Sequence, residues 1–503
     1  EVVLGEGAVL KNFGGMSAVR VTENASLTME SGSLICDEVD VITDRARIHK
    51  DSKASDPYFE TETGPAGAVW VQGYDFVMED GAEIRDVLGR AVYMDGGTAW
   101  LNGQIYDLRQ DPDTGSNGTE KRIKDMWQGN NGLAGHIRNN AEMILGNTFL
   151  LDNSNTDIKM DGAFYDCSGY LEMQQGAVIR NLVGTAIRGH AGTGIEIVVD
   201  GEICGILEGG NAINLNESDD LLCTIGPNAY IHDNTVWYGA VYVQGRGIHV
   251  DLYGRIENNY STNKSGGMVL ANNFSGHSAT MYDGATIKNN VSKNDGAGMV
   301  VSCGTFVMEG GEISGNVATG AVENGIGGGV YVRRGGTFIM EDGSITDNVS
   351  KGAGGGIYYT AENYGTPSIP ARIQLLGGTI ARNLMQADVT LEADNTASVT
   401  GGVENDITIG GSSYSYLDRA LAIGDDVALG EEEVYLEKYD ITMENPAGEV
   451  RFGNASAEVI QGGLGESTAK GWSDTELASF WFASEKPVNT FALSLPAGLN
   501  PDL

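Results

Sequence analysis

Acidic side chains that face outward on neighbouring repeats are the first candidates for chemistry in this sequence. Glu196 and Asp251 fall at outward positions of corresponding strands, two repeats apart. Stacked strands lie about 4.8 Å apart, so the two backbones are predicted to be roughly 9.6 Å apart. Inverting glycosidases hold their two carboxyls about 6.5–9.5 Å apart and retaining ones about 5–5.5 Å apart, so this pair fits inversion unless the side chains lean together. His249 shares a face with Asp251 and can tune the pKa of that acid.

Two further aspartates, Asp295 and Asp233, are candidate catalytic acids. The place of Asp295 before its strand is aligned with small residues in neighbouring repeats, namely Ser265, Gly327 and Gly354. Asp233 precedes the aromatic pair Trp237–Tyr238. The competing interpretation is that both acids are turn residues, because Asp86 and Asp347 share the place of Asp233 in other repeats. Glu196 and Asp251 likewise have the alternative of being ordinary surface acids.

A patch of polar side chains is predicted on the outward face of three successive repeats. Amide, guanidinium, imidazole and phenol groups can bond sugar hydroxyls, and neighbouring aromatic rings can stack on sugars. The next repeats carry small or apolar residues at these positions (Val269, Ala271, Val300, Ser302), so the patch is local. The alternative is a bland solvated surface. The predicted substrate-binding residues are Arg188, His190, Asn214, Asn216, Tyr242 and Gln244, with Trp237, Tyr238, His249 and, in an insertion, Trp127.

One acidic loop has the chemistry of a cation site. Glu217, Asp219 and Asp220 offer the hard oxygen ligands that Ca²⁺ prefers, although the loop lacks an EF-hand pattern. A solvated loop is the alternative interpretation. No cofactor is required by the predicted acid–base chemistry.

Charge and composition exclude several classes of protein. The chain of 503 residues has 31 basic and 69 acidic side chains, a net charge of −38, which repels nucleic acid and anionic lipid. No apolar run reaches the roughly 18 residues of a membrane helix, so no membrane insertion is expected. The 73 glycines follow no collagen period, and the five cysteines form no CxxC motif for zinc or a disulfide framework.

Internal repeats predict the elements that carry these side chains. One phrase recurs, with a Gly-Gly strand such as 328–332, a Thr-Phe-x-Met strand such as 337–340, and a closing Ile-x-x-Asn such as 345–348. Apolar residues alternate with period two, which is typical of strands. No repeat can bury its apolar face alone, so stacking must build the core. The closing isoleucines are Ile84, Ile105, Ile179, Ile203, Ile231, Ile256, Ile287, Ile313, Ile345 and Ile380, with a long gap after Ile105.

Two columns define which side chains face inward and outward. The inward column of the Gly-Gly strand is predicted to be Val92, Ile187, Ile213, Val241, Met268, Met299, Val330 and Ile357. The outward column is Tyr93, Arg188, Asn214, Tyr242, Val269, Val300, Tyr331 and Tyr358. A third column, of asparagines that can bond amide to amide along the stack, is Asn234, Asn259, Asn290, Asn316, Asn348 and Asn383.

The predicted fold is all-β, a parallel β-helix solenoid with inserted loops. Residues 1–20 are interpreted as an N-terminal cap or linker, 21–405 as the β-helix and 406–503 as a C-terminal β-rich cap. Insertions are predicted at 109–150, 217–228 and 360–371, where long loops often build the walls of a site. The ends of such a helix need cover, which a partner domain or subunit can supply.

The glycine-rich repeats and the asparagine column resemble the right-handed parallel β-helix of the pectin-lyase-like superfamily, over roughly residues 20–405. This resemblance implies a carbohydrate-processing fold, and among its hydrolases the chain looks most like the lacto-N-biosidases of gut bacteria. Those enzymes cleave milk and mucin oligosaccharides with two aspartates. In this sequence the residues around Asp295 supply only one of them. Fold alone does not establish function.

Two functional classes follow from these observations. The first is an extracellular or bacterial cell-surface glycoside hydrolase acting on oligosaccharides or glycans by two carboxylates, with a polysaccharide lyase as a variant. The lyase ranks lower because a polyanionic substrate suits a chain of charge −38 only if calcium or a basic pocket intervenes. The second is a non-catalytic adhesin or carbohydrate-binding stalk, which the bland repeats support. The local polar patch and the insertion at 109–150 favour the enzyme, although a sugar-binding adhesin can share both features.

Overall fold

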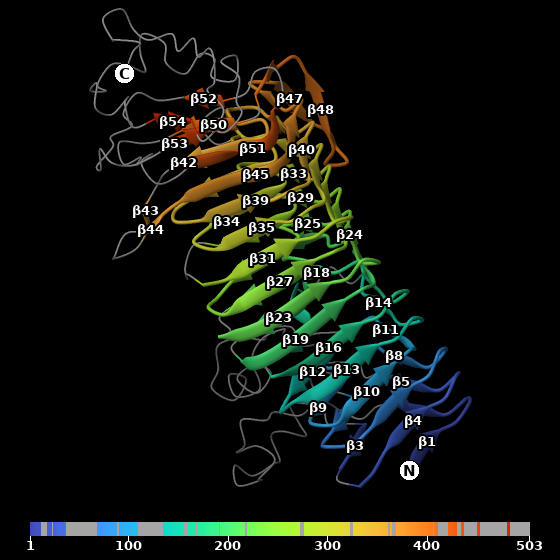
Figure 1. Cartoon of the computed structure of the whole chain (residues 1–503). Coiled ribbons are helices and arrows are strands. Elements are labelled where there is room, and N and C mark those ends of the chain that lie inside the picture. The colour runs from blue at the N-terminus through green and yellow to red at the C-terminus, as the bar shows by residue number, and fades with distance from the viewer. Residues whose placement is uncertain are drawn as a thin grey trace, which may run out of the picture. The chain divides into compact units, whose positions relative to one another are not determined.

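The computed structural model of the chain is an all-β solenoid of stacked parallel strands, the architecture of a parallel β-helix (Figure 1). It describes residues 1–11, 18–22, 24–36, 68–87, 90–108, 134–154, 159–166, 168–190, 192–216, 219–271, 276–321, 325–360, 363–364, 369–405, 407–410, 421–429, 434–436, 450–452 and 480–482. Among these residues there is no helix long and apolar enough to cross a membrane.

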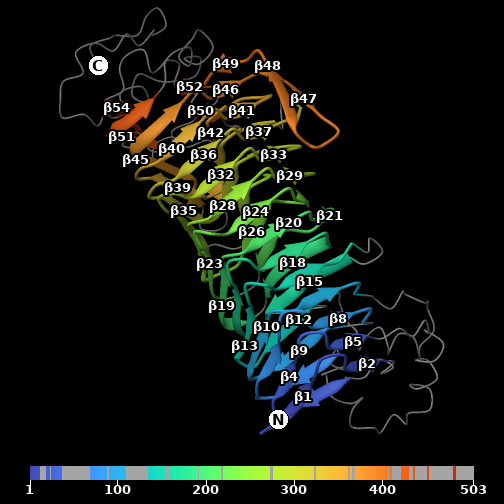
Figure 2. The same cartoon turned by 90° about the vertical axis from the view of Figure 1, so that its right-hand side faces the viewer.

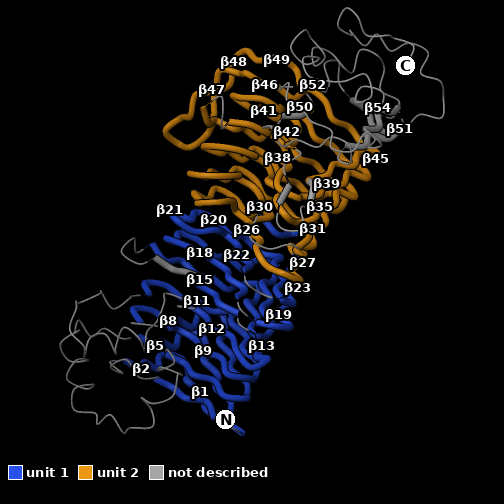
Figure 3. Tube along the Cα trace, turned by 90° about the vertical axis from the view of Figure 1, so that its left-hand side faces the viewer, with its two compact units in different colours: residues 1–224, 228–230 blue, residues 225–227, 231–503 orange. Residues whose placement is uncertain are grey.

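The chain divides into two compact units, residues 1–224 with 228–230 and residues 225–227 with 231–503 (Figure 3). We call each turn of the solenoid a coil. Equivalent strands of successive coils stack on one another, and we call each such stack a sheet. We number the sheets in the order in which a coil visits them. Sheet 1 holds the Gly-Gly strands, sheet 2 the Thr-Phe-x-Met strands and sheet 3 the closing isoleucines; sheet 4 consists of very short strands that follow them.

In the first unit, neighbouring strands of each sheet pair in parallel. Sheet 1 runs through β3 (Val19–Val21), β6 (Val69–Val71), β9 (Val92–Asp95), β12 (Gly135–Arg138), β15 (Lys159–Asp166), β18 (Val183–His190) and β22 (Ile213–Asn216). Sheet 2 runs through β1 (Val2–Leu4), β4 (Leu27–Met29), β7 (Phe76–Met78), β10 (Thr98–Leu101), β13 (Ala141–Leu145), β16 (Gly169–Met173) and β19 (Thr193–Val199). Sheet 3 runs through β2 (Val9–Lys11), β5 (Leu34–Cys36), β8 (Glu83–Arg85), β11 (Gln104–Tyr106), β14 (Leu150–Asp152), β17 (Val178–Arg180) and β20 (Glu202–Cys204).

The second unit repeats this plan and adds sheet 4. Sheet 1 runs through β26 (Val241–Gln244), β30 (Met268–Leu270), β34 (Met299–Ser302), β38 (Val330–Arg333), β42 (Ile357–Thr360), β50 (Ile407–Gly410) and β52 (Val434–Leu436). Sheet 2 runs through β27 (Ile248–Leu252), β31 (Ser278–Met281), β35 (Thr305–Met308), β39 (Thr337–Met340), the long β45 (Arg372–Ala381) and β51 (Leu421–Leu429). Sheet 3 runs through β28 (Arg255–Glu257), β32 (Thr286–Lys288), β36 (Glu312–Ser314), β40 (Ser344–Thr346) and the end of β45. Sheet 4 runs through β25 (Thr235–Val236), β29 (Tyr260–Ser261), β33 (Val291–Ser292), β37 (Val317–Ala318), β41 (Val349–Ser350) and β46 (Leu384–Met385).

The core is built by the inward positions of the period-two pattern. Phe306 and Met308, which alternate with outward residues on β35, are fully buried, and Phe306 stacks on Phe338 of the next coil at 5.8 Å between ring centroids. The predicted inward column of sheet 1 is confirmed, because each of its residues has 0% exposed surface: Val92, Ile187, Ile213, Val241, Met268, Met299, Val330 and Ile357. Burial of one large apolar side chain contributes about 1.5–3 kcal/mol, so the stacked coils, rather than any single repeat, hold the fold together.

The long gap after Ile105 contains a coil that the isoleucine pattern missed. Leu151 pairs with Ile105 on one side and with Ile179 on the other, so a leucine fills the closing position there. The predicted irregular excursion from 109 to 150 is therefore wrong in its second half, where β12 and β13 form regular strands. Residues 109–133, with Trp127, lie outside the described part.

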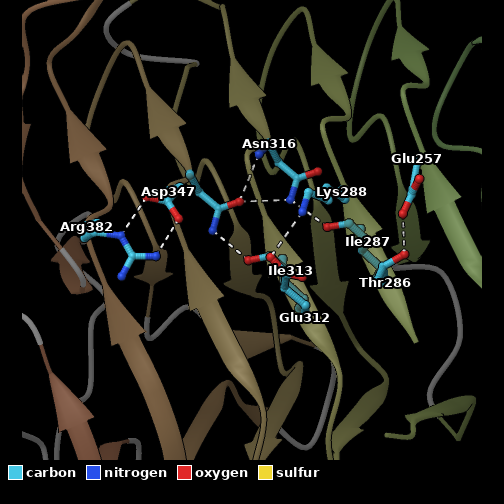
Figure 4. A network of polar contacts seen from close by, with 10 residues as sticks. Glu257, Thr286, Ile287, Lys288, Glu312, Ile313, Asn316, Asp347 and Arg382 are labelled. Atoms are coloured by element: carbon cyan, nitrogen blue, oxygen red, sulfur yellow. Dashed lines mark hydrogen bonds and ion pairs between the residues drawn. The ribbon is translucent and has the colours of Figure 1, made fainter. Parts of the chain in front are cut away.

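The asparagine column is confirmed as a buried ladder in the second unit. Asn316 donates from Nδ2 to the Ile287 carbonyl (2.9 Å) and to Oδ1 of Asn348 (2.9 Å), as Figure 4 shows. Its own Oδ1 accepts from the backbone and the side chain of Asn290. Each amide thus satisfies the polar groups of a buried turn, which explains why the repeat keeps asparagine there.

A second column consists of residues with left-handed backbone just before the asparagines. It includes Asp233 (φ 51°), Asn289 (φ 53°), Gly315 (φ 63°) and Asp347 (φ 58°). Aspartate, asparagine and glycine are the residues that adopt this conformation most readily. The turn therefore accounts for an aspartate at 233 without any catalytic role.

A β-hairpin folds over the outward side of sheet 4 (Figure 2). Its strands are β47 (Asp388–Leu391) and β48 (Ala397–Thr400), paired antiparallel. Val389 and Val399 from the hairpin pack with the sheet-4 valines Val291, Val317 and Val349. This second, smaller core shields outward apolar side chains that the period-two pattern alone would expose.

Parallel pairing extends past both predicted boundaries of the β-helix. At the start, β1 and β2 pair in register with β4 and β5. After residue 405, β50, β51 and β52 continue sheets 1 and 2. The predicted divisions at 20 and 405 remain predictions of domain structure.

Among the described residues of the first unit, one acid has an inward position. Asp166 ends β15 opposite Ile137 and Gly189, at an inward position with 0% exposed surface. One carboxylate oxygen accepts from the Ser168 N–H (2.9 Å), whereas Oδ2 is buried without a hydrogen-bond partner among the described residues. Burial raises the pKa of Asp166 to about 7, although the N–H groups of Ser168 and Gly169 act in the opposite direction.

We expect the stability of the protein to depend on pH through Asp166. Because the folded-state pKa is raised, the stabilising contribution is complete below the ordinary value of 3.8 and is lost as the pH rises through about 7. Each unit of pKa shift corresponds to about 1.4 kcal/mol, so the total is about 4 kcal/mol. Asp166→Asn should flatten this dependence and melt higher than wild type at pH 8, with a smaller difference at pH 5. Thermal melts across that range test it, and the exposed Asp80→Asn should behave as wild type; a variant that melts lower at pH 8 would contradict this account.

Candidate functional site

The polar residues predicted in the first unit lie together on the outer side of sheet 1. Arg188 and His190 of β18 pair with Asn214 and Asn216 of β22. The Asn216 side chain joins both, with its Oδ1 accepting from Arg188 Nε (3.3 Å) and lying 2.8 Å from His190 Nδ1. The guanidinium of Arg188 also lies over the Tyr165 ring, 5.9 Å from its centroid.

Sequence alignment missed two coils in this outward column. The column does not run from Tyr93 straight to Arg188, because His136 and Tyr165 stand between them in register. The imidazole of His136 stacks between the two tyrosine rings, with centroids 5.1 and 5.2 Å apart. Both coils were hidden because one follows the 109–133 insertion and the other lacks the Gly-Gly phrase.

Glu196 lies on sheet 2 of the first unit, among other acids. It is exposed on β19 and pairs with Tyr170, which pairs with Glu142 in turn. Burial and a hydrogen bond to Glu172 (3.0 Å) raise the pKa of Tyr170, and the Glu196 and Glu142 carboxylates raise it further. Asp251, the other acid of the predicted pair, belongs to the second unit, so its surroundings are given with that unit.

In the second unit, the predicted sugar-binding side chains form an aromatic ridge. Trp237 is 48% exposed and meets Tyr238 edge-on, and Tyr238 lies 5.7 Å from Tyr242 between ring centroids. The Tyr242 hydroxyl bonds Gln244 two residues along β26. Burial raises the pKa of Tyr242 to about 12, so this phenol remains a hydrogen-bond donor at neutral pH.

Two stacked turns of the same kind place Lys264 and Asp295 side by side. Ser261 Oγ bonds the Lys264 carbonyl (2.5 Å), and Ser292 Oγ bonds the Asp295 carbonyl (3.2 Å) in the next coil. In this solenoid each N–H bonds the carbonyl of the residue that precedes its partner in the next coil, as Met268 does with Gly298. The Ser265 N–H donates to the Asp295 carbonyl and the Gly296 N–H to the Ile326 carbonyl. Ser265, Gly296 and Gly327 therefore share a column. Asp295 therefore aligns with Lys264, Ile326 and Ala353. The sequence alignment with Ser265, Gly327 and Gly354 is wrong by one residue.

The outer side of sheet 1 next to Asp295 is an apolar floor rather than a bland exposed surface. Val269, Val300, Tyr331 and Tyr358 point outward as predicted, yet each is at most 5% exposed. They pack with Ile326 and Ala353, which occupy the position of Asp295 in the turns of the following coils, and with partly buried Tyr242. The turns fold over the strands because Gly296 (φ 59°) and Gly327 (φ 69°) adopt left-handed backbone beneath them.

This floor perturbs the Asp295 carboxyl. Burial raises its pKa to about 6, against the opposing charges of Arg333 and Lys264 and the N–H of Ile326. Its Oδ1 is buried and has no hydrogen-bond partner among the described residues. Burial, and next the charge of Arg333, lower the pKa of Lys264 in turn. A carboxyl near neutrality beside a weakened ammonium is suited to proton transfer.

Asp251 has a different environment, on the outer side of sheet 2. Its Oδ1 accepts from the Tyr282 hydroxyl (3.0 Å) and lies 3.1 Å from His249 Nε2. His249 and Asp251 thus share one face of β27, as their spacing predicts. The structure places Asp295 in a turn before sheet 1, Asp251 on sheet 2, and Asp233 in the turn before sheet 4.

The remaining predicted site residues give weaker support to their roles. The Asp233 side chain is 65% exposed and pairs with His232 (2.7 Å). Asp219 and Asp220 are exposed at the start of the strand Asp220–Ile225, which fits calcium ligands and a solvated loop equally. Glu217 and Trp127 lie outside the described residues.

Lys264, Arg333 and Ser278 are the residues of interest that the sequence analysis missed. Lys264 and Arg333 carry a signal in retrospect, because basic side chains are scarce in a chain with 31 of them against 69 acids. No protein-family model, curated protein or solved structure matches the chain. The site must therefore be judged by its own chemistry.

Proposed function

We propose that the chain is a carbohydrate-active enzyme that cleaves glycosidic bonds in oligosaccharides or glycans, as a glycoside hydrolase, with Asp295 as the proton donor. The observation that carries the proposal is the raised pKa of Asp295, about 6, on a half-buried carboxyl with an unbonded oxygen. Such a group is protonated in a useful fraction near neutral pH and still acidic enough to protonate a leaving oxygen.

The aromatic ridge and polar side chains beside this turn support a sugar substrate. Trp237 and Tyr238 offer ring surface, and Tyr242 and Gln244 offer hydrogen-bonding groups in the same unit. The two-carboxylate mechanism also needs a second acid that activates water. Glu196 and Asp251, the acids predicted for that role, lie on sheet 2, whereas Asp295 precedes sheet 1. An extracellular or cell-surface location, and milk- or mucin-type glycans as substrates, belong to the same proposal.

A polysaccharide lyase is a second candidate, favoured by the two cations near Asp295. Lys264, with its lowered pKa, can act as the base, and the Arg333 guanidinium can bind a uronate carboxylate. This is the local basic environment that a chain of charge −38 needs to accept an acidic glycan. In this chemistry too, Asp295 protonates the leaving oxygen.

A panel of milk and mucin oligosaccharides, pectin fragments and plant glucans tests the proposal. New reducing ends without an unsaturated product identify a hydrolase, whereas ultraviolet absorbance from a new C=C bond identifies a lyase. Binding on a glycan array with no product from any glycan would overturn the enzyme and favour the adhesin.

Removal of the Lys264 charge is expected to shift the pH profile of cleavage. Because that cation lowers the pKa of Asp295, Lys264→Met should raise it, and the limb of kcat/KM that reports the acid should move to higher pH. Lys293→Met is the control, because it removes an exposed lysine from the turn that contains Asp295. An unshifted limb would show that Asp295 is not the titrating acid.

A further inference from the structure

A hydrogen-bonded chain of serine, histidine and aspartate lies on the outer side of sheet 2 in the second unit. Ser278 Oγ is 2.7 Å from His249 Nδ1, and His249 Nε2 is 3.1 Å from Asp251 Oδ1. The same Asp251 oxygen accepts from the Tyr282 hydroxyl at 3.0 Å. None of these contacts is used by the chemistry proposed for Asp295, which precedes sheet 1.

The register of strands β27 and β31 brings these side chains together. His249 and Asp251 are two residues apart on β27 and so face the same side. Ser278 of β31 pairs directly with His249, one coil away. Tyr282 follows β31 and stacks on Tyr253 with centroids 4.3 Å apart and planes 5° apart, which fixes the phenol that holds Asp251. The next coil has Thr305 in place of Ser278, so it does not repeat the arrangement.

From this geometry we propose an ester-cleaving site with Ser278 as the nucleophile and His249 as the general base. Asp251 is a positioning residue, because it accepts from Nε2–H and so leaves the Nδ1 lone pair directed at the Ser278 hydroxyl. This is the division of labour by which unrelated folds activate serine, recognised by geometry rather than by sequence order. The inference stands independently of the function proposed for Asp295.

The reaction is an acyl transfer that needs only an ester and water. Ser278 Oγ attacks the carbonyl carbon as its proton passes to His249 Nδ1, and the ester C–O bond breaks as that proton passes to the leaving alcohol. Water, deprotonated by His249, then attacks the acyl-serine, and the proton returns to Ser278 as the acid leaves. The Thr280 hydroxyl, on the same face of β31, can donate to the oxyanion.

The exposure of the cluster indicates the class of substrate. The His249 side chain is 37% exposed and Tyr253 is 36% exposed, so the serine lies on an open face rather than in a deep pocket. Such a face suits a small acyl group carried as an ester on a larger molecule. The Tyr253–Tyr282 stack supplies ring surface beside it.

A fluorophosphonate probe and p-nitrophenyl acetate test the proposal on the whole chain. We expect one phosphonyl group on Ser278, found by peptide mass mapping, and ester hydrolysis that Ser278→Ala and His249→Gln each abolish. Asp251→Asn should slow labelling by about 10³–10⁴-fold, because it disturbs the tautomer. Thr305→Ala, one coil along the same column, should label as wild type.

The reactivity of a thiol at position 278 separates a catalytic role of His249 from a structural one. Ser278→Cys should react with iodoacetamide faster than the same variant with His249→Gln added. Circular dichroism confirms that each variant folds. A folded wild type that takes up no phosphonate, or that is labelled equally without His249, would overturn the proposal.

Discussion

Replacement of Asp295 by asparagine is expected to lower kcat of glycan cleavage by about 10²–10⁴-fold, with little change in KM. The amide has the shape of the acid and fits the same turn, so the Ile326 N–H keeps an acceptor. It has no proton to give to the leaving oxygen. Because the substitution also removes a buried charge from an apolar floor, the folded state should be at least as stable as wild type above pH 6.

The matched control for this variant is Asp342→Asn. Asp342 is also a turn aspartate of the second unit, but it is exposed and accepts only a local bond from the Gly343 N–H (2.7 Å). It should leave kcat and stability unchanged. Glycan cleavage that survives Asp295→Asn would keep the enzyme class and remove Asp295 from its mechanism.

Truncation of Asn316 to alanine is expected to destabilise the second unit by about 3 kcal/mol or more. The Ile287 carbonyl, the Asn348 side chain and the Asn290 backbone N–H each lose a bond in a buried setting. An unsatisfied buried polar group costs about 1–3 kcal/mol. The loss should extend beyond one turn, since the neighbouring amides are bonded in series, from Asn290 through Asn316 to Asn348.

Urea unfolding of Asn316→Ala and of Asn294→Ala measures this effect. Asn294 lies in the turn after β33, one coil before Asn316, and its side chain makes one weaker bond, 3.3 Å to Asn263, in a half-buried turn. Its truncation should cost less than about 1 kcal/mol. Equal losses for the two variants would show that the ladder does not stabilise the stack beyond an ordinary turn.

The stacked architecture could be predicted from the sequence because the core imposes one rule on every coil. A side chain that faces a dry interior must be apolar in each repeat, and Met299 and Val330 obey that rule in register. The asparagine ladder follows in the same way from buried turns. The prediction failed at Leu151, where a leucine satisfies the core equally well and so escapes a search for isoleucine.

The environment of the site could not be predicted, because it depends on contacts between coils. The sequence alignment pairs Asp295 with Gly327, whereas in the structure Gly296 holds the place of Gly327. This shift of one residue in a glycine-rich turn hides the alignment of Asp295 with Lys264. The raised pKa of Asp295 arises from turns that fold over Tyr331 and Val300. Nothing in the period-two pattern indicates that these outward residues are covered.

The same limit applies to Ser278. A serine at an outward position of a strand is common. Ser278 becomes a candidate nucleophile only because His249 lies beside it on the neighbouring coil. His249 and Asp251 could be placed on one face from their spacing, and the structure adds the third member of the chain.

Titration of the Asp295 carboxyl in the folded protein tests the central claim most directly. The difference in carboxyl infrared absorption between wild type and Asp295→Asn, followed from pH 3 to pH 8, isolates this one group. The account predicts a carboxyl that titrates near pH 6 and is absent from the variant. A group that titrates at its ordinary value, about 3.9, would contradict it, because the turn would then hold a solvated aspartate with no proton to give near neutral pH.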